Sequence, residues 1–86
     1  PHIGWNGINS LKKDSKLLSN ISADPIFYFL NSYAIEIDEK IDYVAHTNYG
    51  VRFVSIIEKN NIFGVQFHPE KSQELGLQLL KNFISL

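Results

Sequence analysis

The 86-residue chain has a formal net charge of −1, is 44% hydrophobic and 13% aromatic, and contains no cysteine. This length allows at most one small domain, and the lack of cysteine excludes a disulfide scaffold, a thiolate metal site and a cysteine nucleophile within these residues. The 8 basic residues nearly balance the 9 acidic ones, and no apolar run is long enough to span a bilayer. We therefore expect a cytoplasmic protein that binds neither nucleic acid nor membranes.

The first strongly apolar segment is residues 27–35 (FYFLNSYAI). Its uninterrupted apolar start is typical of a buried strand rather than a half-exposed edge strand. Before it, residues 9–23 mix Ser, Lys and Asn with isolated leucines, which predicts a loop with one helical turn at most. After it, the charged residues 36–40 (EIDEK) predict a solvated connection.

Three more strands are expected in the second half of the chain. Residues 42–47 alternate polar and apolar side chains, and Tyr49-Gly50 follows as a turn signal. Residues 51–57 and 62–68 are rich in β-branched and aromatic side chains. The polar residues 58–61 (EKNN) between them predict a hairpin with a short loop.

From Ser72 onward the apolar period changes to that of a helix. Ser72 is expected to cap the first turn through its side chain. One apolar stripe marks the buried face of this C-terminal amphipathic helix; its residues are Leu75, Leu79, Leu80, Phe83 and Ile84.

Several strands and one helix do not make a complete layered architecture, because a buried sheet needs cover on both faces. The chain also contains no methionine. We therefore expect part of a longer polypeptide: half of a parallel sheet, with an apolar face and an open edge that another segment or chain covers.

The strongest chemical signal is residues 64–72 (GVQFHPEKS), where a strand runs into a polar turn before the helix. Pro69 stiffens this turn and favours an extended His68. In extended backbone, residues two apart face the same side, so Glu70 could orient the His68 imidazole as a base. The alternative is a strand-end histidine followed by an acid at the helix entry.

Other catalytic chemistries fit the sequence poorly. No serine lies in a glycine-bounded elbow, which disfavours a serine hydrolase. No ligand-like spacing links His2, His46 and His68, so no metal site is expected.

Residues 64–72 resemble the closing motif of class I glutamine amidotransferases, in which histidine and glutamate complete a Cys-His-Glu triad. Residues 1–6 (PHIGWN), residues 27–33 (FYFLNSY) and Tyr49-Gly50 followed by Phe53 are similar to one branch of that family. The glutaminase subunits of this branch supply ammonia to a β/α-barrel cyclase that makes imidazole glycerol phosphate in histidine biosynthesis.

The resemblance implies an α/β, flavodoxin-like, three-layer domain, of which residues 1–86 would be the C-terminal portion, mostly strands plus a C-terminal helix. Family members carry the nucleophilic cysteine in the preceding half. We therefore expect this chain to need that half as a partner and to be inactive alone.

The resemblance also implies roles for single residues. His68 would be the general base and acid, and Glu70 would orient it. Ser32 and Tyr33 would contact the amino-acid end of glutamine; just before them, Asn31 stands where family members usually have histidine. The residues implied at the cyclase interface are Trp5, Asn6, Tyr28 and Lys71. No cofactor is implied.

Two alternatives stay open at this level. Paralogous subunits supply ammonia for amidino groups on bacterial surface sugars, and Asn31 leaves that acceptor open. A non-catalytic interaction module that kept only this half of the domain is the other alternative.

Overall fold

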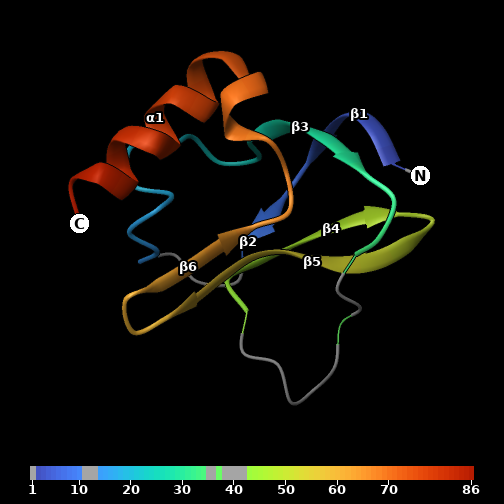
Figure 1. Ribbon diagram of the computed structural model, residues 1–86, viewed down its shortest axis with the longest axis horizontal. Coiled ribbons are helices and arrows are strands. Elements are labelled where there is room, and N and C mark those ends of the chain that lie inside the picture. Colours follow the sequence, from blue (N-terminus) through green and yellow to red (C-terminus); the bar gives the residue numbers. More distant parts are fainter. Residues whose placement is uncertain (1, 11–13, 35–36, 38–42) are drawn as a thin grey trace.

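The computed structural model describes residues 2–10, 14–34, 37 and 43–86, which form two sheets and a C-terminal helix (Figure 1). Residues 36 and 38–40 of the expected charged connection lie outside these residues. The elements are β1 (His2–Gly7), β2 (Asn9–Ser10), β3 (Ile26–Asn31), β4 (Ala45–Tyr49), β5 (Val51–Lys59), β6 (Ile62–Val65), the 3₁₀ helix η1 (Pro69–Lys71) and α1 (Gln73–Ile84). Strands β1 and β3 form one sheet, and the other sheet has the order β2-β4-β5-β6.

Every strand pair among the described residues is antiparallel, so the expectation of a parallel half-sheet is wrong for this part of the chain. For the pairs β4–β5 and β5–β6 the connections explain the difference, because parallel neighbours need a long crossover whereas tight turns join antiparallel ones. The chain reverses at Gly50, whose φ of 73° favours glycine. It reverses again after β5 at Asn60, with φ 57°.

The hairpin of β5 and β6 has a shorter loop than the sequence predicts. Glu58 pairs with Phe63 inside the ladder, which leaves two residues in the turn. A carboxylate is tolerated in this strand because it accepts hydrogen bonds from the Ser15 hydroxyl at 2.6 Å and from the Leu17 backbone N–H at 3.3 Å.

Strand β3 is buried on one face only and ends at Asn31, whereas the sequence predicts a fully buried strand over residues 27–35. Residue 35 lies outside the described residues. Phe27 and Phe29 point into the core, while Ile26 and Leu30 are 51% and 41% exposed. The neighbouring strand β1, which sequence patterning misses because Gly4 interrupts the apolar alternation, places Trp5 opposite Tyr28.

The core draws side chains from both sheets, the helix and the loop before β3. Asn82 of α1 fixes that loop by donating hydrogen bonds to the carbonyl oxygens of Leu17 and Ser19 at 2.8 and 2.6 Å. The loop prediction is confirmed for residues 14–23. Asn9–Ser10 instead form the two-residue strand β2, and residues 11–13 lie outside the described residues. The buried cluster comprises Ile8, Leu17, Phe27, Phe29, Val44, Ala45, Phe53, Ile56, Phe67 and Leu79.

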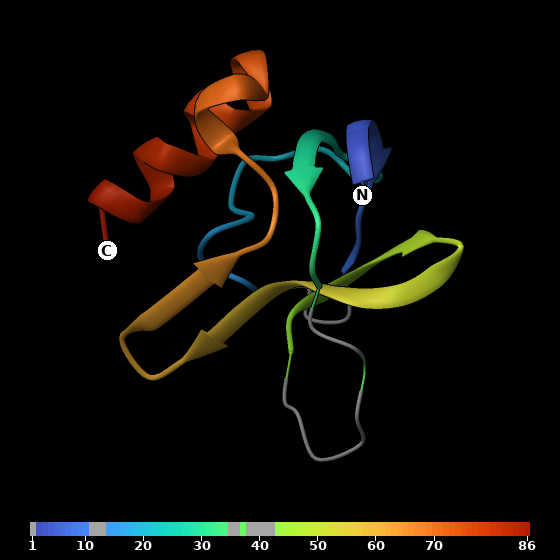
Figure 2. The same ribbon diagram turned by 45° about the vertical axis from the view of Figure 1, so that its right-hand side comes forward.

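The strand predicted over residues 62–68 is divided between the two sheets. Strand β6 ends at Val65, yet the Gln66 N–H still donates to Ser55 in β5, and the His68 N–H donates to Tyr28 in β3, both at 2.9 Å. Figure 2 shows the chain passing from β6 toward β3 and the helix. This crossing carries His68 from one sheet to the other.

The predicted C-terminal helix is confirmed as α1, but its apolar stripe is covered only in part. Leu79 is buried and Leu75 packs against the core, whereas Phe83 and Ile84 are 51% and 80% exposed. The Ser72 side chain does not cap the helix, so that prediction is wrong. No helix of the described residues is long and apolar enough to cross a membrane.

Gly76→Ala is expected to lower the free energy of unfolding by about 1–3 kcal/mol, a typical overpacking cost. An added Cβ would clash with the Pro69 carbonyl oxygen and come within 2.9 Å of the Ser72 Cβ. The higher helix propensity of alanine offsets at most about 1 kcal/mol of this loss. Urea unfolding of the full-length gene product measures the change.

The matched control is Gly64→Ala, because an added Cβ there has no atom within 4 Å. We expect it to change stability by less than about 0.5 kcal/mol. Equal losses for the two variants would contradict the close approach of Gly76 to Pro69.

Candidate functional site

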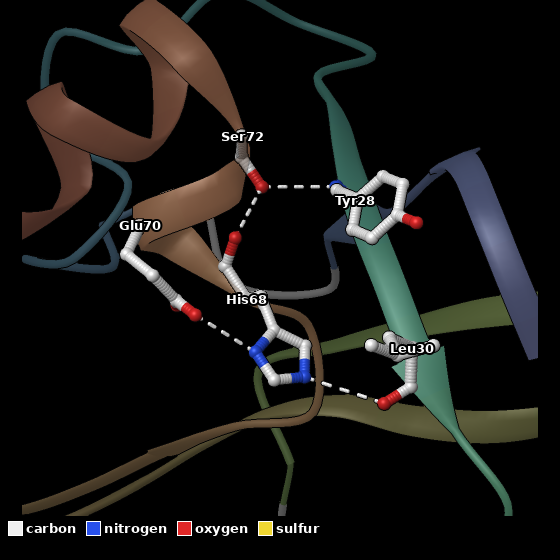
Figure 3. A network of polar contacts seen from close by, with 5 residues as sticks. All are labelled: Tyr28, Leu30, His68, Glu70 and Ser72. Carbon is white, nitrogen blue, oxygen red and sulfur yellow. Dashed lines mark hydrogen bonds and ion pairs between the residues drawn. The ribbon is translucent and has the colours of Figure 1, made fainter.

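The His68 imidazole and the Glu70 carboxylate form a hydrogen-bonded pair at the turn between the crossing segment and α1 (Figure 3). His68 Nδ1 lies 2.9 Å from Glu70 Oε2. His68 is extended, with φ −105° and ψ 97°, as the following Pro69 favours. The side chains are 36% and 58% exposed, so the pair lies at the surface of the described residues.

The two ring nitrogens of His68 face two acceptors. Nδ1 faces the Glu70 carboxylate, and Nε2 lies 3.3 Å from the carbonyl oxygen of Leu30. A neutral imidazole has one N–H, and donation to a carboxylate is the stronger, charge-assisted bond. The neutral ring would therefore carry its hydrogen on Nδ1 and leave the Nε2 lone pair free to take a proton, while the imidazolium would donate to both acceptors.

The main chain of His68 is tied to strand β3 on both sides. Its N–H donates to the Tyr28 carbonyl at 2.9 Å. Its carbonyl accepts from the Ser72 hydroxyl at 2.6 Å, and the same hydroxyl accepts from the Tyr28 N–H at 2.9 Å. Sequence reasoning assigned Ser72 to helix capping, and nothing in the local pattern distinguishes the two roles.

The pKa of Glu70 lies below its ordinary value, chiefly because the His68 side chain donates a hydrogen bond to the carboxylate. A backbone hydrogen bond acts in the same direction, burial opposes it, and the charges of His68 and Lys71 add to the lowering. The carboxylate is thus favoured as the charged acceptor that holds the imidazole.

Ser32 and Tyr33 lie directly after the end of β3, beyond the Leu30 carbonyl that faces His68. Both side chains are exposed, Tyr33 to 88%. Asn31 donates from Nδ2 to the Tyr33 carbonyl at 3.0 Å, so its amide holds the turn that leaves the strand.

The four residues implied at a partner interface lie on three elements, with Trp5 and Asn6 on β1, Tyr28 on β3 and Lys71 on η1. The ring of Trp5, 49% exposed, packs edge-on against Tyr28 with centroids 5.5 Å apart. Asn6 is tied down, since its Nδ2 donates to the Asn48 carbonyl of β4 at 3.1 Å. Lys71 is exposed at the end of η1.

The other two histidines serve packing. The His2 ring is stacked between Phe29 and Tyr49, with centroids 4.7 and 3.9 Å apart, and burial is the main reason that its pKa is lowered. Burial likewise lowers the pKa of His46. Across the part of the chain that the structure describes, no three acidic or histidine side chains gather to hold a metal ion.

Comparison with known proteins adds family information to this geometry. A sequence profile for "Glutamine amidotransferase class-I" matches residues 1–86. The whole chain is 50% identical to the imidazole glycerol phosphate synthase subunit HisH of Leptospira interrogans and 51% identical to that of Buchnera aphidicola from Acyrthosiphon pisum, covering 42% of each. It is 44% identical to the subunit of the same name from Methanocaldococcus jannaschii, covering 43% of it. The chain thus spans about two-fifths of these relatives.

The Glu70 carboxyl is expected to titrate with a pKa below its ordinary value of 4.5. Stability due to this group is therefore present above its unfolded-state pKa and is lost as the pH falls through the lower folded-state pKa. Its contribution is small because the side chain is exposed. The ¹³C shift of the Glu70 carboxyl carbon, followed against pH, measures the midpoint.

His68→Phe keeps a ring but removes both donors, so the Glu70 midpoint should move up toward 4.5. Glu74→Gln, in the first turn of α1, is the control and should leave the midpoint in place. A midpoint at or above the ordinary value in the unaltered protein would contradict the hydrogen bond.

Proposed function

The chain belongs to the class I glutamine amidotransferase family, and from this we propose that it is part of a glutaminase subunit. The subunit would hydrolyse glutamine to glutamate and ammonia. The ammonia would pass to a cyclase partner that makes imidazole glycerol phosphate in histidine biosynthesis. The names of the relatives support this acceptor over amidino-sugar synthesis.

We propose that residues 1–86 are the C-terminal portion of one amidotransferase domain. The relatives are more than twice as long as the matched region, since it covers 42% of them. The 86 residues contain no cysteine, so the nucleophile of the family's triad would come from outside them. The piece alone would be inactive.

The observation that carries the proposed chemistry is the bond between His68 Nδ1 and Glu70 at 2.9 Å. Glu70 would fix the tautomer and stabilise the imidazolium. Nε2 would then take the thiol proton as the cysteine attacks the side-chain amide of glutamine, and would return that proton to the departing ammonia. This step would leave a thioester between the cysteine and the glutamyl group. Water would then hydrolyse the thioester, with His68 acting as the base.

Substrate binding is assigned to the end of strand β3. Ser32 and Tyr33 would contact the amino-acid end of glutamine, because both are exposed just beyond the Leu30 carbonyl that His68 faces. Asn31, in place of the usual histidine, would keep hydrogen-bonding capacity but could not titrate.

The partner is proposed to be the β/α-barrel cyclase, forming a heterodimer in the cytoplasm. The outer face of β1 and β3 supports this, since it leaves Ile3, Trp5 and Leu30 at least 41% exposed. Tyr28 would belong to the same contact, and Asn6 would hold β1 in place for it. Lys71 would form an intersubunit ion pair, which is worth only about 0–1 kcal/mol when exposed.

His68→Ala in the full-length protein is expected to lower glutamine hydrolysis by about 10²–10⁴-fold, the usual contribution of general acid and base catalysis. A glutamate-release assay with the cyclase present measures the rate. His46→Ala is the control and should hydrolyse glutamine normally, because His46 lies in β4 outside the site. Near-normal hydrolysis by His68→Ala would refute the assignment of the base.

Trp5→Ala is expected to weaken binding of the cyclase by about 2 kcal/mol, the size of an interface hot spot, or about thirtyfold in Kd. Titration calorimetry measures the Kd. Phe83→Ala is the matched control, since Phe83 is also half exposed, at 51% against 49%, and also packs edge-on against an aromatic ring. Equal affinities for the two variants would remove Trp5 from the interface.

A further inference from the structure

We infer that Ser72 is a positioning residue for the His68 base, acting through the main chain of Tyr28. The inference rests on the proposed function, because it assigns Ser72 a task in that site. Its basis is a closed ring of three hydrogen bonds among Tyr28, His68 and Ser72. Figure 3 shows the two bonds that the Ser72 hydroxyl makes.

The hydroxyl of Ser72 both accepts and donates a hydrogen bond. It accepts from the Tyr28 N–H at 2.9 Å and donates to the His68 carbonyl at 2.6 Å. The ring closes where the His68 N–H donates to the Tyr28 carbonyl at 2.9 Å. Since Ser72 is only 2% exposed, water cannot readily replace either bond.

This use of the hydroxyl differs from the capping role that a serine before a helix usually has. The side chain makes no hydrogen bond to the first N–H groups of α1, although serine is a preferred cap. The residue that follows, Gln73, has a φ of 55°, a region uncommon for residues other than glycine. The turn therefore directs the hydroxyl toward β3 and His68 at the expense of the helix end.

The ring of hydrogen bonds controls the distance between the His68 imidazole and strand β3, which the bond between His68 and Glu70 does not control. Glu70 lies two residues from His68, so their contact is local and survives a displacement of the whole turn. The contact of His68 Nε2 with the Leu30 carbonyl, at 3.3 Å, instead depends on how the turn is seated on β3. Ser72 thus sets where the base lies relative to the strand that ends at the proposed glutamine contacts.

The same ring reaches the proposed docking face. The Tyr28 main chain belongs to the ring, and its side chain packs edge-on against Trp5. The ring therefore links the strand that carries this face to the main chain of His68, both directly and through Ser72.

Ser72→Ala in the full-length protein with its cyclase is expected to lower kcat for glutamine hydrolysis by about 10- to 100-fold, as a misplaced catalytic group does. KM for glutamine should stay within about twofold, because ground-state binding is unchanged. Ser55→Ala is the matched control: Ser55 is 1% exposed, but its hydroxyl has no hydrogen-bond partner among the described residues. It should keep the normal kcat.

A thermal melt and a circular dichroism spectrum of each variant separate misplacement from unfolding. If Ser72→Ala does not fold, Ser72→Cys takes its place, because a thiol fills the space that alanine leaves empty but is a weak donor and acceptor. A kcat equal to that of Ser55→Ala in a folded Ser72 variant would overturn the inference. So would a loss confined to KM.

The result is read together with His68→Ala. An inactive His68→Ala with a fully active Ser72 variant would overturn the positioning role and leave the proposed function standing. An active His68→Ala would instead overturn the proposed function.

Discussion

The site depends on one constraint: the segment that follows β6 changes its hydrogen-bond partner from strand β5 to strand β3. Within three residues, Gln66 still bonds to β5 and His68 already bonds to β3. Phe67 between them is 3% exposed, and burying such a ring stabilises the fold by about 1.5–3 kcal/mol. Because extended backbone sends neighbouring side chains to opposite sides, the inward direction of Phe67 turns His68 outward, toward Glu70.

The turn after the crossing is compact because a glycine allows it. Helix α1 passes so close to the Pro69 carbonyl that a Cβ at Gly76 has no room. Leu79, one turn further along, anchors the helix in the core. The dyad is therefore held between a buried aromatic ring on one side and a buried helix face on the other, although its own side chains are exposed.

The described residues bury one face of the β1–β3 sheet well and leave its other face open. The inner face of β1 and β3 is completed by Phe27 and Phe29, while the outer face exposes Ile3 and Ile26 to more than half of their area. An open face and an exposed dyad fit a portion of a larger domain. Cover by the remainder of that domain would lower the local dielectric and strengthen the bond between His68 and Glu70.

The sequence by itself determined the local features: the β5–β6 hairpin, the C-terminal helix and the pairing of His68 with Glu70. Each follows from spacing over a few residues, which periodicity and a stiff proline decide. The tertiary structure alone decided that strand β1 lies against β3, that β3 is buried on one face, and that the Ser72 hydroxyl bonds to Tyr28 instead of capping the helix. These features join residues at least 19 positions apart, and such contacts depend on packing that no local pattern encodes.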